Sequence, residues 1–190
     1  MTKPKHSKIL VVDIESTGFI NEGGKICEIG IVELNMYSGK SRILFDRIVR
    51  EEDMSNVKKD AWIFEHSSLT YNEVMKAPLL GKFISELNAI FTMAPAAAYN
   101  KKFDFTFLRS RGITIPQELA EPMFILTDIL KIRNPNDYWR NNGSPYKWPT
   151  VQESLDHYFP ELTEPHRAID DAEMEAKIIF QMYKDGASIL

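Results

Sequence analysis

The stretch ILVVDIESTGF, residues 9–19, is the part of the chain on which its fold and chemistry depend. Its first four residues are apolar and mostly β-branched, which predicts a buried strand. Asp13 and Glu15 follow, and because side chains i and i+2 of a strand share a face, these two carboxylates point the same way. Like charges on a core strand are costly unless a cation lies between them. A divalent ion with oxygen ligands is one interpretation, and two surface acids at a strand end are the other.

The composition is that of an ordinary soluble globular protein, with 190 residues, 44% hydrophobic and 26% charged. This length predicts a single domain over residues 1–190, with a flexible arm at residues 1–7. The net charge of −4 argues against a nucleic-acid coat protein, which would be basic, but permits an enzyme that holds a few phosphates through metal ions. The single cysteine, Cys27, excludes an internal disulfide, and we expect it in the core.

Neither a targeting segment nor a membrane span is expected. The apolar run that follows the lysines near the start is interrupted by Asp13 after four residues, too few for a signal peptide. No later run approaches the roughly 20 apolar residues of a transmembrane helix. We therefore expect a cytoplasmic protein with no membrane partner.

The remaining pattern predicts a mixed α/β sheet with helices on its faces. Strands at residues 26–34 and 43–49, joined by short turns, predict an antiparallel meander. Short apolar runs predict two more strands, at residues 96–99 and 123–127, which makes five. Residues 134–150 are rich in proline and asparagine and predict a long loop. Helical periodicity and stop signals predict helices at residues 79–91, 103–111, 151–158 and 168–183.

Two later segments carry acids that a plain fold does not require. Asp104 follows a predicted strand at the start of a helix, where a capping or first-turn role is the alternative. His166 precedes Asp170 and Asp171, although such residues are often simply solvated. Asp104 and one of Asp170 and Asp171, together with the acidic pair of the first strand, supply four carboxylates, which match the charge of two divalent ions. Two ions about 4 Å apart assist in-line displacement at phosphorus, and a histidine with a pKa of about 6.5 suits a general base.

Helix geometry distinguishes the two adjacent aspartates. At about 100° per residue, Asp171 projects between Ile178 and Met182, on the side that the helix turns toward the protein. Glu175 lies one turn further along that side as a rival. Asp170 falls instead in an entirely polar stripe that should face water, together with Glu173, Lys177, Gln181 and Lys184. The sequence therefore favours Asp171 as the fourth inward acid.

Three segments resemble the exonuclease motifs of the DEDDh family, namely DIESTG from residue 13, YNKKFDFTFL from residue 99 and HRAIDDAE from residue 166. The family includes the proofreading subunit of bacterial DNA polymerase III, RNase T and oligoribonuclease. The resemblance implies a ribonuclease-H-like fold, with a five-stranded mixed sheet flanked by helices. It also implies stepwise hydrolysis of nucleic acid from the 3′ end to nucleoside 5′-monophosphates. Arg167 stands where the related DEDDy subclass has a tyrosine, so the histidine subclass is the better match.

The resemblance also implies a role for each matching residue. The implied ligands of two Mg²⁺ or Mn²⁺ ions are Asp13, Glu15, Asp104 and Asp171, and the implied catalytic residues are His166 and Glu15. The implied contacts with the terminal nucleotide are Thr17, Gly18, Phe19, Asn100 and Phe103. The sequence departs from the family at Ser67 and Ser68, where glycine is common, and in the aromatic loop over residues 134–150.

The basic and aromatic residues near these motifs have two interpretations each. Phosphate contact or a solvated helix face fits the basic ones, which are Lys101, Lys102, Arg109, Arg111 and Arg167. Base stacking or attachment of the loop to the domain fits Trp139, Tyr146 and Trp148.

We therefore expect a metal-dependent 3′–5′ exonuclease acting on single-stranded nucleic acid, with DNA favoured. RNA 3′-end trimming is the alternative, since DNA and RNA ends differ at a single hydroxyl. A catalytically silent nucleic-acid-binding or polymerase-docking module is the non-enzymatic alternative, which the full set of acids disfavours. A polymerase partner is permitted but not indicated, because no tail is appended to the domain, and the oligomeric state is left open.

Overall fold

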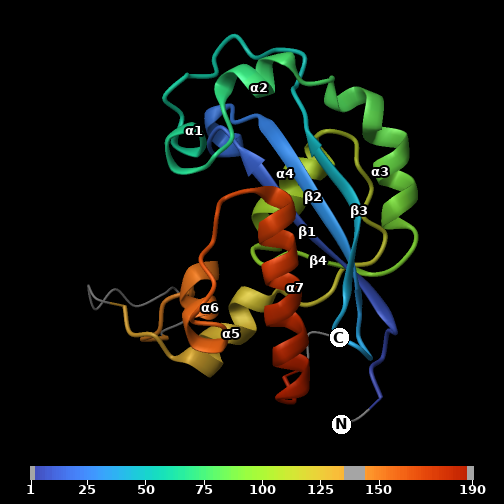
Figure 1. Cartoon of the computed structure of the whole chain (residues 1–190), viewed down its shortest axis with the longest axis vertical. Helices are drawn as coiled ribbons and strands as arrows, with labels where there is room; N and C mark the ends of the chain where they lie inside the picture. The colour runs from blue at the N-terminus through green and yellow to red at the C-terminus, as the bar shows by residue number, and fades with distance from the viewer. Residues whose placement is uncertain (1–2, 135–143, 188–190) are drawn as a thin grey trace.

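A four-stranded mixed sheet runs through the centre of the molecule (Figure 1). The computed structural model describes residues 3–134 and 144–187. The strands are β1 (Lys8–Ser16), β2 (Ile26–Asn35), β3 (Ser41–Ile48) and the short β4 (Ala96–Ala97), in the spatial order β3-β2-β1-β4. β1, β2 and β3 pair antiparallel, and β4 pairs in parallel with β1. The predicted α/β class and the antiparallel meander are confirmed.

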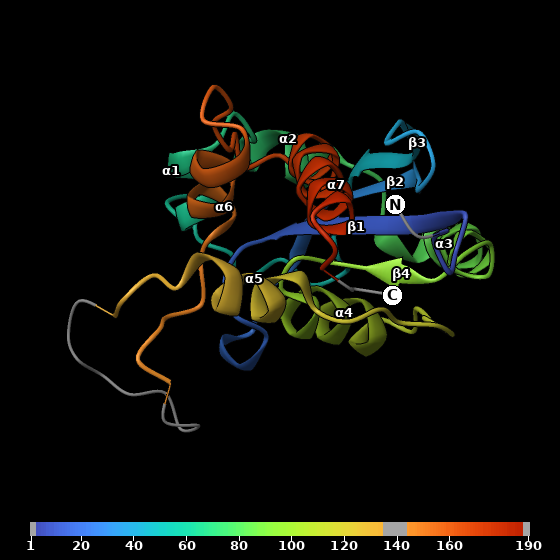
Figure 2. The ribbon, with the colours of Figure 1, turned by 90° about the horizontal axis from the view of Figure 1, so that it is seen from below.

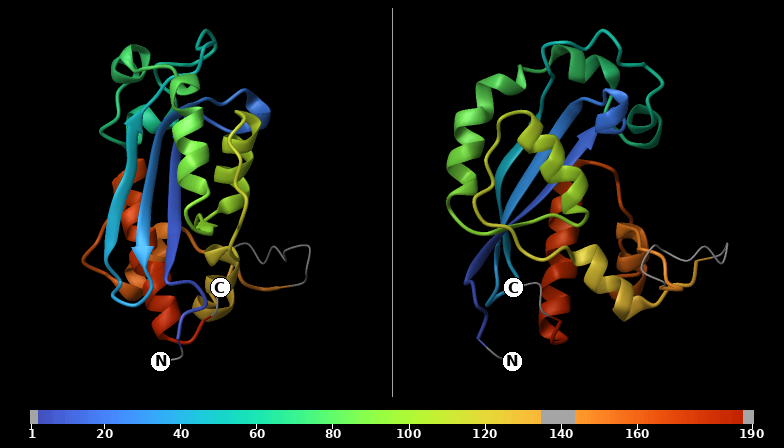
Figure 3. Two further views of the ribbon diagram at one scale, coloured as in Figure 1. Left: turned by 90° about the vertical axis from the view of Figure 1, so that its right-hand side faces the viewer. Right: turned by 180° about the vertical axis from the view of Figure 1, so that it is seen from behind.

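Helices cover both faces of this sheet. On one face α7 (Ala168–Lys184) lies across β1 and β2, while α4 (Lys101–Ser110) lies on the other side (Figure 2). α5 (Pro122–Leu130) packs Met123 and Leu126 into the same core as α7. Seen from behind, α3 (Ile84–Phe91) and α4 lie in front of the strands (Figure 3). The remaining helices are α1 (Trp62–His66), α2 (Tyr71–Lys76) and α6 (Val151–Tyr158), with 3₁₀ turns at Ile20–Glu22 and Leu80–Phe83.

Alternation along β1 directs its side chains into two different cores. Leu10, Val12 and Ile14 pack in the core that α3 and α4 complete. Ile9 and Val11 pack in the second core, which α7 completes. Continuing this alternation places the acids at positions 13 and 15 on the face of β1 that α7 covers.

β2 is covered on both faces, which explains its nearly continuous apolar sequence. Gly30 pairs with Asp13 of β1 in the middle of this strand. A Cβ atom at Gly30 would lie 2.2 Å from the carbonyl oxygen of Ala168, the first residue of α7. The glycine therefore permits α7 to begin directly against β2, beside the acids of β1. Cys27 of the same strand is fully buried, as predicted.

The prediction of a fifth strand at residues 123–127 is wrong. This segment belongs to α5, which begins with Pro122 in its first turn. Met123, Leu126 and Thr127 are buried while Phe124 is exposed, which is helical rather than alternating periodicity. A short apolar run fits a strand or a buried helix equally, and the proline is the signal that favours a helix start.

The predicted loop over residues 134–150 is closed at its base by backbone pairing. The N–H of Asn134 donates to the carbonyl of Pro145, and the N–H of Lys147 donates to that of Ile132. Residues 135–143, which include Trp139, lie outside the described part of the chain. In the predicted arm, Pro4 is buried. None of the helices within residues 3–134 and 144–187 is long and apolar enough to cross a membrane.

Candidate active site

β1 carries two of the predicted acids to a place where, among the described residues, no strand pairs with one of its edges. β4 pairs with β1 only at Leu10 and Val11, before Asp13 is reached. Beyond that point, the backbone N–H of Ile14 donates instead to Oδ1 of Asp104, at 3.3 Å. The edge of β1 left open by the short β4 is thus where an acid from α4 joins the strand.

Asp104 lies in the first turn of α4 and is only 4% exposed. The helix begins after Asn100, and the Asp104 N–H donates to the Asn100 carbonyl at 3.3 Å. A solvated first-turn acid would not be buried, so the simple capping interpretation does not account for it. Its carboxylate reaches across to β1 and enters the same cluster as Asp13 and Glu15.

α7 supplies the fourth acid, as helix geometry predicted. Asp171 is 2% exposed, whereas Asp170 is exposed to solvent. The helix begins at Ala168, so His166 precedes the first turn. His166 has a φ of 55°, in the left-handed region that non-glycine residues seldom adopt. Because His166 lies in this turn and not in α7, the helix does not set the direction of its imidazole.

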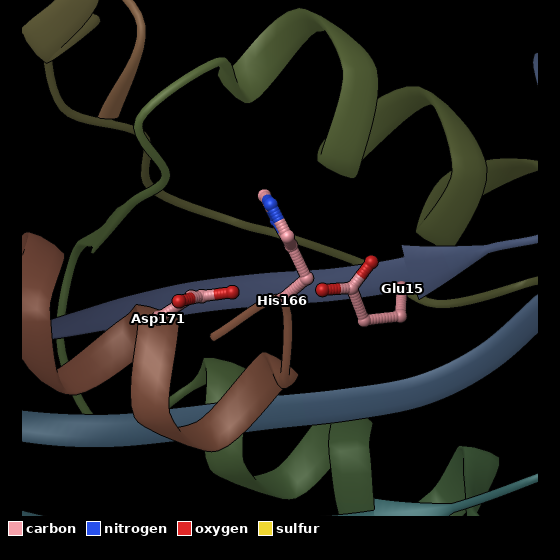
Figure 4. Close-up of side chains that lie close together, drawn as sticks. All are labelled: Glu15, His166 and Asp171. Carbon is pink, nitrogen blue, oxygen red and sulfur yellow. The ribbon is translucent and has the colours of Figure 1, made fainter. Parts of the chain in front are cut away.

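Glu15, His166 and Asp171 meet at one point (Figure 4). One ligand atom from each of them lies within 4.8 Å of the others. In the close-up, the carboxylates of Glu15 and Asp171 point toward one another across a gap, with His166 rising between them. Asp13 and Asp104 lie close to this trio. In addition to burial, the charges of Asp104, Glu15 and Asp171 raise the pKa of Asp13, and the charge of Asp104 raises that of Glu15. The structure therefore brings all four predicted acids and the histidine into one cluster.

Burial and mutual repulsion raise the pKa values of these carboxyls. Burial, followed by the charge of Asp171, raises the pKa of Glu15 to about 9. Burial likewise raises the pKa of Asp104 and of Asp171 to about 8 each. Burial raises the pKa of Asp13 well above its usual range, and neighbouring acids add to the shift. This cluster resists ionisation unless positive charge enters it.

The donor set fits divalent cations. Oδ1 of Asp171 is buried and has no hydrogen-bond partner among the described residues. A buried, unpaired carboxylate oxygen is costly, and a cation removes that cost. Oxygen-only ligands are what Mg²⁺ and Mn²⁺ prefer. Asp13, Glu15, Asp104 and Asp171 are the residues that would hold such ions.

A model of the RNase T exonuclease family matches residues 10–179. The chain belongs to the exonuclease family. The match spans every residue of the acidic cluster, the whole of α4 and α7 as far as Ile179. It confirms the resemblance of the three motifs to the DEDDh exonucleases.

One similar protein is the DNA polymerase III PolC-type of Clostridium perfringens, 26% identical over 175 residues that cover 92% of this chain. Another is the same type of polymerase from Halalkalibacterium halodurans, 27% identical over 185 residues, 95% of this chain. The exonuclease chain spans only 11% and 12% of these two relatives. Among solved structures, the nuclease domain of 3′hExo, a DEDDh family member bound to rAMP, has a TM-score of 0.72 at 14% identity. That similarity covers 100% of this chain and 98% of the other and establishes the shared ribonuclease-H-like exonuclease fold.

The residues expected to contact the terminal nucleotide lie next to the acidic cluster. Thr17 closes the turn after β1, since its Oγ1 accepts from the N–H of Lys25 at 3.0 Å. Gly18 has a φ of 148°, which favours glycine. Phe19 is 62% exposed, and its ring meets that of Phe103 edge to face at 6.2 Å between centroids. The exonuclease chain thus presents an exposed aromatic surface one residue from Asp104.

A buried ion pair that the sequence motifs do not indicate anchors the start of α7. Glu28 of β2 is fully buried and accepts hydrogen bonds from Arg167 Nε, at 3.1 and 3.0 Å, and from the Ala168 N–H at 3.1 Å. Arg167 also donates to Ser68 at 2.9 Å. Arg167 is therefore neither free to track phosphates nor part of a solvated helix face. It fixes the turn that carries His166.

His166 also has aromatic and acidic neighbours that the motifs did not indicate. The Trp62 ring lies 4.9 Å from the imidazole and stacks on His66 at 4.5 Å. Glu164 Oε1 lies 3.8 Å from Nδ1 of His166. Burial, assisted by the charge of His66, lowers the pKa of His166 below its usual value. A lowered pKa keeps the imidazole neutral, which is the form that accepts a proton.

Glu175 is a further buried carboxylate beside the cluster, as its position on α7 predicts. It is 2% exposed, and Oε2 accepts from the Tyr99 N–H at 3.2 Å. Burial raises the pKa of Glu175, and Asp104 and Asp171 raise it further. Its hydrogen bond ties α7 to the segment that leads into α4.

The other basic residues are mostly held by acids. Lys101 and Arg109 pair with Glu118, and Arg111 pairs with Glu51. Lys102 is exposed and lines a cavity beside the acidic cluster. Trp148 also lines this cavity and packs against Phe124 of α5 at 5.3 Å. Trp148 therefore attaches the loop to α5 and also borders the cavity, so its position fits both interpretations.

Proposed function

We propose that this chain is a metal-dependent 3′–5′ exonuclease that hydrolyses single-stranded nucleic acid, with DNA favoured, to nucleoside 5′-monophosphates. The observation that carries the proposal is the cluster of Asp13, Glu15, Asp104 and Asp171, of which Asp104 and Asp171 are buried, with His166 within 4.8 Å of Glu15 and Asp171. A structural role alone does not require acids whose pKa values are raised this far.

Two divalent ions bound by the four acids would activate the attacking water and stabilise the leaving oxygen. Glu15 and Asp171 face each other across a gap, and in this proposal the scissile phosphate enters that gap. His166 is the general base, because its neutral imidazole accepts the proton of the attacking water. Trp62, Glu164 and the Glu28–Arg167 pair hold this imidazole in position.

Phe19 supports a preference for a single-stranded 3′ end over a base-paired one. A base paired in a duplex must be separated before its phosphodiester reaches the acids, which costs a few kcal/mol. The exposed ring of Phe19, together with Phe103, offers an apolar surface for the separated base. Thr17, Gly18 and Asn100 complete the expected contacts with the terminal nucleotide.

DNA is favoured because the similar polymerases are DNA polymerases, although the 3′hExo nuclease domain, which matches this fold with a TM-score of 0.72, is bound to rAMP. RNA trimming is therefore the second candidate. Polymerase docking without hydrolysis is the third, and the complete acidic cluster weighs against it.

End-labelled single-stranded DNA, blunt duplex DNA and RNA of the same sequence test the proposal in one assay. Mg²⁺ or Mn²⁺ should support release of monophosphates from the free 3′ end of single-stranded DNA, and EDTA should stop it. Asp13→Asn is the matched inactive variant. Cleavage that persists in EDTA, or that begins at the 5′ end, would refute the proposed activity.

A further inference from the structure

A cavity of about 360 Å³ adjoins the acidic cluster. Its walls come from the turn after β1, from α4 and the residue before it, from the start of α5, and from Trp148 in the described part of the 134–150 loop. The volume lies within the range of about 300–1,000 Å³ that is typical of small-molecule sites. Glu121 lines this cavity and its charge acts on Asp104, so the cavity lies close to that member of the cluster.

Two aromatic pairs line the cavity. Phe19 and Phe103 form one pair, at 6.2 Å, and Phe124 and Trp148 form the other, at 5.3 Å. Phe19, Phe124 and Trp148 are 62%, 44% and 49% exposed. Aromatic side chains exposed in this way are stacking surfaces for nucleobases, worth about 1–3 kcal/mol per base. Stacking by itself does not distinguish one base from another.

One polar group in the cavity lacks a partner. Glu121 lines the cavity, is only 6% exposed, and its Oε1 has no hydrogen-bond partner among the described residues. Burial raises the pKa of Glu121, and the charges of Lys101 and Lys102 oppose that shift. Lys101 itself is engaged by Glu118 and by the Leu119 carbonyl, so it does not satisfy the Glu121 oxygen.

The backbone around Glu121 is held in place. Pro122 follows it in the first turn of α5, and the Met123 N–H donates to the Tyr99 carbonyl at 3.3 Å. The Leu119 N–H donates to the Ala96 carbonyl at 2.8 Å. These bonds fix the segment against the turn that leads into α4. A buried carboxylate held there is completed by a ligand that donates hydrogen bonds.

We propose that this cavity reads the 3′-terminal base and that Glu121 makes it prefer guanine, an inference that rests on the proposed exonuclease function. An ionised carboxylate accepts hydrogen bonds and donates none. Guanine presents two adjacent donors on its pairing edge, the N1–H and the 2-amino group, which match the two oxygens of Glu121. The other bases place an acceptor beside their donor. The Phe19–Phe103 pair and the Phe124–Trp148 pair, both of which line the cavity, provide the stacking surfaces.

Hydrolysis of otherwise identical single-stranded oligonucleotides ending in guanine or hypoxanthine tests this inference. Hypoxanthine lacks only the 2-amino group. An unpaired polar group costs about 1–3 kcal/mol, so the guanine end should be removed about tenfold faster. Glu121→Gln should bring the ratio of the two rates close to one. Asp128→Asn, the same charge change at an exposed position of α5, should leave the ratio as in the wild type.

A binding measurement separates this inference from the proposed activity. Calorimetric titration with dGMP and with dIMP in EDTA compares the two bases without hydrolysis. The wild type should bind dGMP about tenfold more tightly, and Glu121→Gln should bind the two alike. Discrimination in binding by a protein that degrades no oligonucleotide would overturn the proposed activity and keep the base-reading site. Degradation with equal rates and equal binding would overturn the base-reading site, as would discrimination that Glu121→Gln retains.

Discussion

Asp170 and Asp171 are neighbours in the chain, yet only Asp171 enters the acidic cluster. Asp171 is 2% exposed, and its Oδ1 has no hydrogen-bond partner among residues 3–134 and 144–187, whereas Asp170 faces solvent. The difference follows from a rotation of about 100° per residue around α7. Residue identity alone does not separate these two acids, but the position of each on the helix does.

Substitution of each aspartate in turn tests the assignment of the fourth ligand. Asp171→Ala should abolish metal-supported cleavage, because it removes an inward oxygen that has only a cation to pair with. Asp170→Ala is the matched control and should be nearly silent. Initial rates over a Mn²⁺ titration measure both. Loss of activity in the Asp170 variant instead would show that the assignment of Asp171 as the fourth ligand is wrong.

The lowered pKa of His166 predicts the acid side of the pH–rate profile. Activity should fall only at a pH below the usual histidine pKa of 6.5, because burial and His66 disfavour the imidazolium. His166→Ala should lower turnover by about 10²- to 10⁴-fold and should remove this decline at low pH, the acid limb of the profile. His66→Gln takes away one repulsive charge and should shift the limb to higher pH. Rates of the three proteins from pH 5 to 8 provide the measurement, and an unchanged limb in His166→Ala would exclude this residue as the base.

At the scale of elements, the site depends on how closely α7 begins against β2. Gly30 leaves room for the Ala168 carbonyl, and Glu28 on the same strand binds Arg167 and the Ala168 N–H. These contacts, more than any feature of α7 itself, set the position of His166 and of Asp171. The strand and the helix therefore act as one support for the catalytic groups.

Gly30→Ala tests this support. A Cβ 2.2 Å from the Ala168 oxygen forces β2 and α7 apart, and such overpacking costs about 1–3 kcal/mol or more. Both the melting temperature and the turnover should fall. Gly81→Ala is the matched control, since its Cβ would meet nothing within 4 Å and its turn should tolerate alanine. Equal melting temperatures for the two variants would show that the close approach of α7 is not required.

The sequence predicted those elements whose periodicity was long enough to be specific. The inward face of α7 extends over several turns, so Asp171 was placed correctly from spacing alone. The run at residues 123–127 is too short to distinguish a strand from a helix, and α5 was missed for that reason. The Glu28–Arg167 pair joins residues 139 positions apart. No local pattern specifies such a contact, which depends on the folded arrangement of β2 and α7.

At the scale of the whole molecule, the acidic cluster opposes folding when no cation is bound. Three of its carboxyls have folded-state pKa values of about 8 to 9, namely Glu15, Asp104 and Asp171. Their unfolded values lie near about 4. Between these limits the folded state holds more protons than the unfolded state, so the free energy of unfolding decreases as pH rises. His166 acts in the opposite direction near pH 6, but it is one group against three.

The protein in EDTA should therefore melt at a lower temperature at pH 8 than at pH 5. Mg²⁺ binds the ionised carboxylates of the folded state, so it should raise the melting temperature more at pH 8 than at pH 5. Asp171→Asn removes one of the shifted acids and should reduce both the decline with pH and the gain with Mg²⁺. Thermal unfolding of the two proteins across this range, with and without the ion, measures these effects. A melting temperature in EDTA that increases steadily from pH 5 to pH 8 would contradict the idea that these acids are held protonated by burial, and with it the electrostatic reason for a cation at this site.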